Sequence, residues 1–188
     1  MAPLPRPEER TLQAVGARRR ERGKPSSDEM VRELRALAGE GSGMVALFDA
    51  RAIAGERHLM SAWAHLGRAR SRGVQRLRDR GAELALFVAG DGQLPRALAR
   101  VGISASTEEF VLVVEKPRAV PEGLARFGLV EAPDVYPRTP DAAVLDRLGI
   151  GEAERRGVPP GSWEGLVLER VALLELEAPH ATSVTAKH

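Results

Sequence analysis

The chain has 188 residues, 43% of them hydrophobic, and a formal net charge of +2. This length predicts one domain, and we find neither a run of about 18 apolar residues nor a secretory signal, so we expect a cytoplasmic protein that does not enter a membrane. Cysteine is missing, which excludes disulfides, thiolate nucleophiles and cysteine zinc sites.

Capping signals and apolar periodicity predict the first elements in chain order. Ser26 and Glu29 have the spacing of a capping box, which predicts a helix that begins there. Residues 44–53 are apolar at consecutive positions, which is typical of a central strand covered on both faces. Residues 56–70 carry apolar side chains at helical spacing and predict the clearest helix of the chain.

The middle of the chain contains one ambiguous element between two clear ones. Residues 82–89 are apolar throughout, so periodicity does not distinguish a short strand from a buried helix. Pro95 in a first turn and Gly102 as a stop predict a helix over residues 93–101. Residues 110–115 are rich in valine, which favours a strand.

The last third is predicted to begin with a surface insertion. Residues 117–140 contain repeated prolines around a possible short helix at 122–127, a composition typical of an excursion outside the core. A short helix at 141–148 should follow. After a glycine- and proline-rich break, Ser162 should cap a last amphipathic helix.

Together these elements predict a single α+β domain over residues 11–177. Its small mixed or antiparallel sheet should be covered by several helices. Residues 11–15 are a possible first strand. Residues 1–10 should form a flexible lead-in, and residues 178–188 a disordered tail.

Positive charge is carried mainly by arginine and is concentrated in two clusters. Arginine makes planar, bidentate contacts with phosphate, which favours a polyanionic partner. Solvated surface faces are the commoner explanation of such runs, and this alternative stays open. The first cluster is Arg18, Arg19, Arg20, Arg22 and Lys24, and the second is Arg68, Arg70, Arg72, Arg76, Arg78 and Arg80.

No set of residues predicts catalysis. His58 and His65 lie seven residues apart and would share a helix face, but a zinc site needs three or four ligands and no histidine–glutamate metal motif accompanies them. A metal-dependent hydrolase is therefore the least favoured function. His58 is better explained as a helix-start residue whose ring bonds to the backbone. Because no acid and base are matched either, we expect a binding protein without cofactor or metal rather than an enzyme.

The glycine-rich junction at residues 89–93 has two possible interpretations. Glycines beside a helix start allow backbone amides to approach an anion, as in phosphate-binding loops. The lysine and hydroxyl of a nucleoside triphosphate loop are missing, and the residues alone favour a tight turn between two helices.

Several motifs follow one another in a recognisable order: His58-Leu59, Ala62, Glu83-Leu84, Gly90, Gln93-Leu94, Ala97, Gly102 and the closing stretch 167–176. This order resembles the small KEOPS-complex subunit related to the PRPK-binding protein, over most of residues 44–177. The resemblance implies that residues 82–89 are helical. Gly92 stands where the family usually has arginine, and Arg96 and Arg100 are close enough in sequence to compensate.

The resemblance also implies a function. Such subunits are non-catalytic members of the complex that installs threonylcarbamoyladenosine in tRNA, where they bind a small Rio-like atypical kinase/ATPase and the 3′ CCA end of tRNA. Because aromatic residues are few, RNA binding should depend on arginine–phosphate contacts in one basic groove. A regulator that binds only the kinase, without RNA, is the alternative. The candidate RNA-binding residues are Arg68, Arg70, Arg72, Gly90, Gln93, Arg96 and Arg100.

Overall fold

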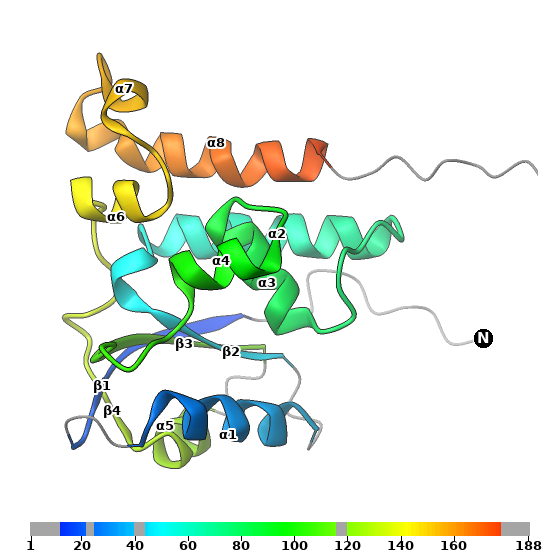
Figure 1. Ribbon diagram of the computed structural model, residues 1–188, viewed down its shortest axis with the longest axis vertical. Coiled ribbons are helices and arrows are strands. Elements are labelled where there is room, and N and C mark those ends of the chain that lie inside the picture. Colours follow the sequence, from blue (N-terminus) through cyan, green and yellow to red (C-terminus); the bar gives the residue numbers. More distant parts are fainter. Residues whose placement is uncertain (1–11, 22–24, 40–43, 116–119, 178–188) are drawn as a thin grey trace, which may run out of the picture.

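The computed structural model describes residues 12–21, 25–39, 44–115 and 120–177. Over these residues, one antiparallel sheet separates a small helical layer from a large one (Figure 1). The small layer contains α1 (Ser27–Gly39) and α5 (Val120–Arg126). The large layer is built mainly from α2 (Glu56–Ser71), α3 (Arg80–Ala89), α4 (Leu94–Val101) and α8 (Trp163–Leu176). The predicted single α+β domain is therefore confirmed.

The sheet has the order β2-β3-β1-β4, with every neighbouring pair antiparallel. Its strands are β1 (Gln13–Arg19), β2 (Val45–Asp49), β3 (Glu109–Val114) and β4 (Leu129–Glu131). The strand predicted at 110–115 is confirmed as β3. The prediction of a central strand over 44–53 is wrong in two respects. β2 ends at Asp49, where η2 (Ala50–Ala52) begins, and it lies at one end of the described sheet. Its residues are all buried nevertheless, because helices cover both faces.

The first strand was also predicted with the wrong bounds. β1 continues past the expected end at residue 15 to Arg19, and Gly16 and Ala17 pair there with Val111 and Phe110 of β3. Gly16 and Ala17 are small and give little hydrophobic signal in the sequence. They are nevertheless part of the sheet, because they pair with β3, which supplies the large side chains. Residues 1–11 and 178–188, including the expected lead-in and tail, lie outside the described residues.

The surface insertion predicted at residues 117–140 is wrong for its described part, residues 120–140. β4 extends the sheet by pairing with β1, and Phe127 and Leu129 are among the largest fully buried side chains. Pro121 lies in the first turn of α5, and Pro133 and the later prolines follow β4. The prolines therefore sit at positions where no ladder hydrogen bond is lost, and they do not exclude the segment from the core.

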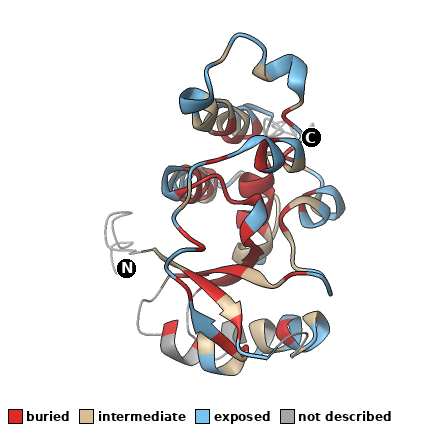
Figure 2. Ribbon diagram, turned by 90° about the vertical axis from the view of Figure 1, so that its left-hand side faces the viewer, coloured by how far each residue is buried: buried red, intermediate tan, exposed pale blue. Residues whose placement is uncertain are grey.

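The helical assignment of residues 82–89 is confirmed by α3. Every residue from Glu83 to Ala89 is buried (Figure 2). Helices α2, α4 and α8 surround this part of α3, so it has no solvent-facing polar stripe. The helical period is therefore not visible in its sequence.

The remaining helices follow their local signals, with one exception. The capping box is confirmed, because Ser26 N donates to Glu29 Oε2 at 2.6 Å and Glu29 N to Ser26 Oγ at 3.3 Å. The helix expected at 141–148 is α6 (Ala142–Arg147), capped by Asp141, and α7 (Glu152–Arg155) comes after it. Ser162 precedes α8 without a side-chain capping bond, because a turn of 3-10 helix, η4 (Pro160–Ser162), leads into it.

His58 joins the start of α2 to the end of α3. Its Nδ1 accepts from the Ala54 amide at 3.1 Å, and its Nε2 lies 2.9 Å from the Val88 carbonyl, to which it must donate. The predicted contact of this ring with the backbone is confirmed. The side chain is fully buried, and burial lowers its pKa from 6.5 to about 4. Only the neutral ring can accept at Nδ1 and donate at Nε2 at the same time.

We expect this histidine to make the fold sensitive to mild acid. His58 binds a proton near pH 6.5 in the unfolded chain and only near pH 4 in the folded chain. The contribution of the neutral ring to the free energy of unfolding is therefore complete above about pH 6.5 and is lost as the pH falls. The free energy of unfolding, measured with urea, should drop by about 3 kcal/mol across this range. His58→Gln keeps a donor and an acceptor and should remove the dependence between about pH 6.5 and 5. The same dependence in wild type and His58→Gln would contradict this account.

Candidate functional site

The junction between α3 and α4 is a tight turn held by its own carboxylate. Gly90 ends α3 in the left-handed conformation, at φ 58°, and a Cβ there would collide with the Arg170 side chain. The amides of residues 90 and 91 bond to the end of α3, and the Gln93 amide donates to Asp91 Oδ1 at 2.9 Å. These three amides have acceptors, so the tight-turn interpretation is the correct one.

Asp91 also gathers two of the candidate arginines. Arg96 donates to both of its carboxylate oxygens, with Nε 2.9 Å from Oδ2, and Arg100 Nη1 lies 3.3 Å from Oδ2. Hydrogen bonds from Arg96 lower the pKa of this carboxyl, because burial opposes them less strongly. One negative charge therefore fixes two guanidinium groups beside the turn.

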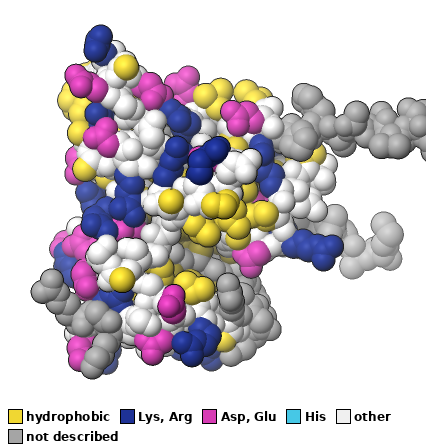
Figure 3. Space-filling view, in the orientation of Figure 1, with side chains coloured by type: hydrophobic (Ala, Val, Ile, Leu, Met, Phe, Trp, Pro, Cys, Tyr) yellow, Lys and Arg dark blue, Asp and Glu magenta, His cyan; other side chains and the backbone are white. Residues whose placement is uncertain are grey.

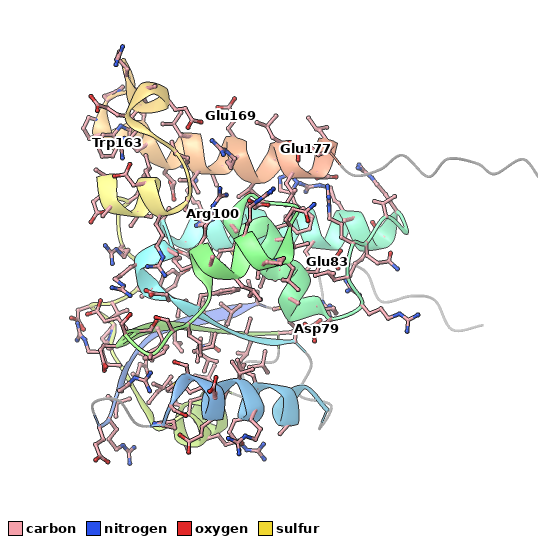
Figure 4. All side chains as sticks on the ribbon, in the orientation of Figure 1. Asp79, Glu83, Arg100, Trp163, Glu169 and Glu177 are labelled. Atoms are coloured by element: carbon pink, nitrogen blue, oxygen red, sulfur yellow. The ribbon has the colours of Figure 1, made fainter. Side chains whose placement is uncertain are left out.

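A groove of about 650 Å³ lies between this junction and α8. Figure 4 shows Arg100 between α4 and α8, with Glu169 and Glu177 on α8. Arginine side chains gather in the same region of the surface in Figure 3. The groove is nevertheless mixed in charge. It is lined by the cations Arg96, Arg100 and Arg170, the acids Asp91, Glu154, Glu169 and Glu177, and the leucines Leu166, Leu173 and Leu174.

Arg68 and Arg72 lie outside this groove, on another carboxylate. Glu175, in the last turn of α8, accepts from Arg68 Nε at 3.1 Å and Arg72 Nη1 at 2.7 Å, and it also pairs with His65. Burial raises the pKa of Glu175, but the bonds from His65 and Arg68 outweigh it and lower the pKa overall. The single basic groove expected from the sequence is therefore divided in two.

Arg70 and Gln93 are not part of the groove lining. Arg70 Nε donates to the buried Glu83 carboxylate at 2.7 Å, and its Nη2 bonds to the carbonyls of Leu77 and Arg78. This guanidinium thus braces the loop between α2 and α3. Gln93 is exposed at the start of α4. Of the seven predicted residues, the groove contains Gly90, Arg96 and Arg100.

Glu83 was not predicted to belong to a site, but it holds the loop between α2 and α3. Its two carboxylate oxygens accept from Arg70 Nε and from the Arg76 amide, each at 2.7 Å, and the residue is fully buried. The available signal was one acid inside an otherwise apolar run, beside an arginine cluster. A buried charge in such a run requires a partner.

The first arginine cluster belongs to the sheet. Arg18 pairs with Glu109 at 2.9 Å and Asp134 at 2.6 Å. Arg19 is buried over the Phe110 ring and donates to the Thr107 carbonyl. Arg22 and Lys24 lie outside the described residues. Of the described members, Arg18 and Arg19 are therefore held by contacts within the fold, whereas Arg20 is exposed.

Among the residues that the structure describes, no three acidic or histidine side chains are grouped so as to hold a metal ion. Nor is any helix in that part of the chain long and apolar enough to cross a bilayer. No protein-family model matches the chain, and a search of curated proteins returns no match. The resemblance to the KEOPS subunits rests on the motif residues themselves.

The account of Glu83 can be tested with Glu83→Gln. This change leaves Arg70 and the loop without a charged acceptor, and we expect a loss of about 3 kcal/mol in the free energy of unfolding. Amides of residues 74–78 should exchange with deuterium faster. The control is Asp134→Asn, which removes an ion pair with Arg18 in which the arginine is 42% and the acid 66% exposed, and it should cost much less than Glu83→Gln. Equal losses in the two variants would show that Glu83 has no special role.

Proposed function

We propose that this chain is a non-catalytic, cytoplasmic subunit of the KEOPS complex that binds its small Rio-like kinase/ATPase and the 3′ CCA end of tRNA. The observation that carries the proposal is the convergence of the motif residues. His58 bonds to the end of α3, Glu83 fixes the loop before α3, and Gly90 joins α3 to α4. Residues that are scattered in the sequence thus build one helical unit beside the groove.

The groove offers contacts suited to an RNA end that is the same in every tRNA. Arg96 uses Nε and Nη2 on Asp91, which leaves further N–H groups on a side chain that is 67% exposed. Phosphate contacts of this kind carry no sequence information, and none is needed for a universal end. Leu166 and Leu173 supply apolar surface on which a base could rest.

The kinase would contact the outer side of α8. Val167, Val171 and Leu174 of this helix are buried, whereas Leu176, which is not part of the groove lining, is 75% exposed. A strongly exposed leucine at the end of the helix offers apolar surface for a partner.

The alternative is a regulator that binds the kinase alone. It is favoured by the carboxylates that already hold the candidate arginines: Asp91 holds Arg96 and Arg100, and Glu175 holds Arg68 and Arg72. In this function, the ion pairs would only fix the helices to one another.

Two matched double variants test the RNA proposal. Arg96→Ala/Arg100→Ala and Arg68→Ala/Arg72→Ala each remove two positive charges that are held by one carboxylate, Asp91 in the first variant and Glu175 in the second. We expect the first to weaken tRNA binding at least about tenfold and to reduce the log–log salt slope by about 1.4, because two contacts to a single strand are lost. The second should have a much smaller effect.

Filter binding with intact tRNA and with tRNA lacking CCA measures this result. The loss should be confined to intact tRNA. If both double variants lose the same affinity, the arginines act only as a diffuse field. If the wild-type chain does not distinguish the two RNAs, the kinase regulator becomes the better proposal.

The kinase surface can be tested with Leu176→Glu. A buried charge in the interface should prevent a stable complex, because an unpaired ion would be desolvated there. Co-expression with the Rio-like kinase followed by size exclusion shows whether the two chains elute together. The control is Leu98→Glu on α4, where the leucine is 47% exposed. Loss of the complex in the control and not in Leu176→Glu would place the interface on α4 instead.

A further inference from the structure

Arg76, which was not among the predicted RNA-binding residues, is held at the edge of the groove. It lies in the loop between α2 and α3, and its amide donates to the buried Glu83 carboxylate at 2.7 Å. At the other end of the side chain, Nη2 donates to the Leu174 carbonyl of α8 at 3.0 Å. These two contacts fix both the backbone and the guanidinium group of this arginine.

The guanidinium group packs against the backbone of Gly92. A Cβ added to Gly92 would lie 2.9 Å from Arg76 Nη1 and 3.6 Å from its Cζ. Gly92 is not among the glycines with positive φ, so its backbone would accept an alanine. The glycine is therefore needed for the space that Arg76 occupies, and not for its own conformation.

Arg76 differs from the arginines of the groove in its charge environment. Arg96, Arg100 and Arg170 all pair with carboxylates, whereas no described acid lies within ion-pair distance of the Arg76 guanidinium. Its Nε and Nη1 have no protein acceptor among the described residues, and neither is a buried atom without a partner. Arg76 is only partly buried, and its side chain is already held by the Leu174 carbonyl.

We propose that Arg76 binds a phosphate of the RNA strand beside the α3–α4 junction, and that Gly92 provides the room for its guanidinium group. A fixed guanidinium loses little side-chain entropy on binding, and it gives up no ion pair. This inference rests on the proposed RNA-binding function. It adds a phosphate contact from an arginine that is not shared with a carboxylate, whereas Arg96 and Arg100 are both paired with Asp91.

A double-mutant cycle tests the proposal, with intact tRNA as the probe. Arg76→Ala should weaken binding about tenfold and lower the salt slope by about 0.7, as expected for one lost phosphate contact to a single strand. Gly92→Ala changes no charge, but it displaces the guanidinium and should weaken binding about threefold. In the Arg76→Ala background, Gly92→Ala should have no further effect. Additive losses would show that the two residues act separately.

Two further variants separate phosphate binding from other roles. Arg76→Gln keeps a donor for the Leu174 carbonyl, so its binding should fall as in Arg76→Ala while its melting temperature stays near that of wild type. Arg78→Ala removes an exposed arginine from the same loop and should change affinity little. Equal losses for Arg76→Ala and Arg78→Ala would overturn the inference, as would an unchanged Arg76→Ala. A wild-type chain without CCA-dependent binding would instead remove the proposed function, and the Arg76 contact with it.

Discussion

The burial of every residue of α3 from Glu83 to Ala89 constrains the rest of the molecule. A helix that is apolar on every side requires neighbours on every side, and α2, α4 and α8 provide them. Its polar groups then need partners inside the protein. Glu83 finds them in Arg70 and the Arg76 amide, and the Val88 carbonyl finds one in His58. The same contacts shape the loop before the helix and the turn after it, so the core and the candidate site are built by one set of interactions.

Electrostatics beside α3 follows a common pattern, in which one acid holds two arginines. Asp91 and Glu175 each do so, which leaves an excess of positive charge at a fixed position. The guanidinium groups of these pairs are partly exposed, but the carboxylates are only 5% and 11% exposed, so a phosphate would share the arginines with the acids rather than replace them. Such pairs are compatible with RNA binding as well as with a purely structural role. Arg76 is informative because its guanidinium group has no competing acid among the described residues.

Local signals in the sequence predicted local structure well. The Ser26–Glu29 capping box and the valine-rich β3 needed only neighbouring residues to be recognised. Residues 82–89 could be assigned as helix only through the family resemblance, because uniform burial removes the periodicity. β1 was placed incorrectly because Gly16 and Ala17 give no apolar signal, and their pairing depends on a strand almost a hundred residues away.

The roles of the arginines depended on the same kind of distant partner. Arg68 and Arg72 pair with Glu175, which lies more than a hundred positions further along the chain. No sequence pattern near residue 70 indicates that this acid is their partner. Arg70 was predicted to bind RNA because it belongs to a cluster of positively charged residues in the sequence. In the structure, its contact with Glu83 determines where its guanidinium group lies. Sequence therefore located the arginine-rich region, and tertiary structure decided which guanidinium groups remain available.

Helix α8 connects the two surfaces of the proposed function. Its inner side holds the Arg76 guanidinium through the Leu174 carbonyl and pairs Glu175 with α2, while Leu176 is exposed one residue further on. All three lie in the last turn of the helix, where carbonyls lack helical partners and the chain frays most readily. A protein bound to the outer leucine would therefore lie within one turn of the carbonyl that holds Arg76. Within the proposed function, any change that binding of the kinase makes in the affinity for RNA would be matched by an equal change that RNA makes in the affinity for the kinase.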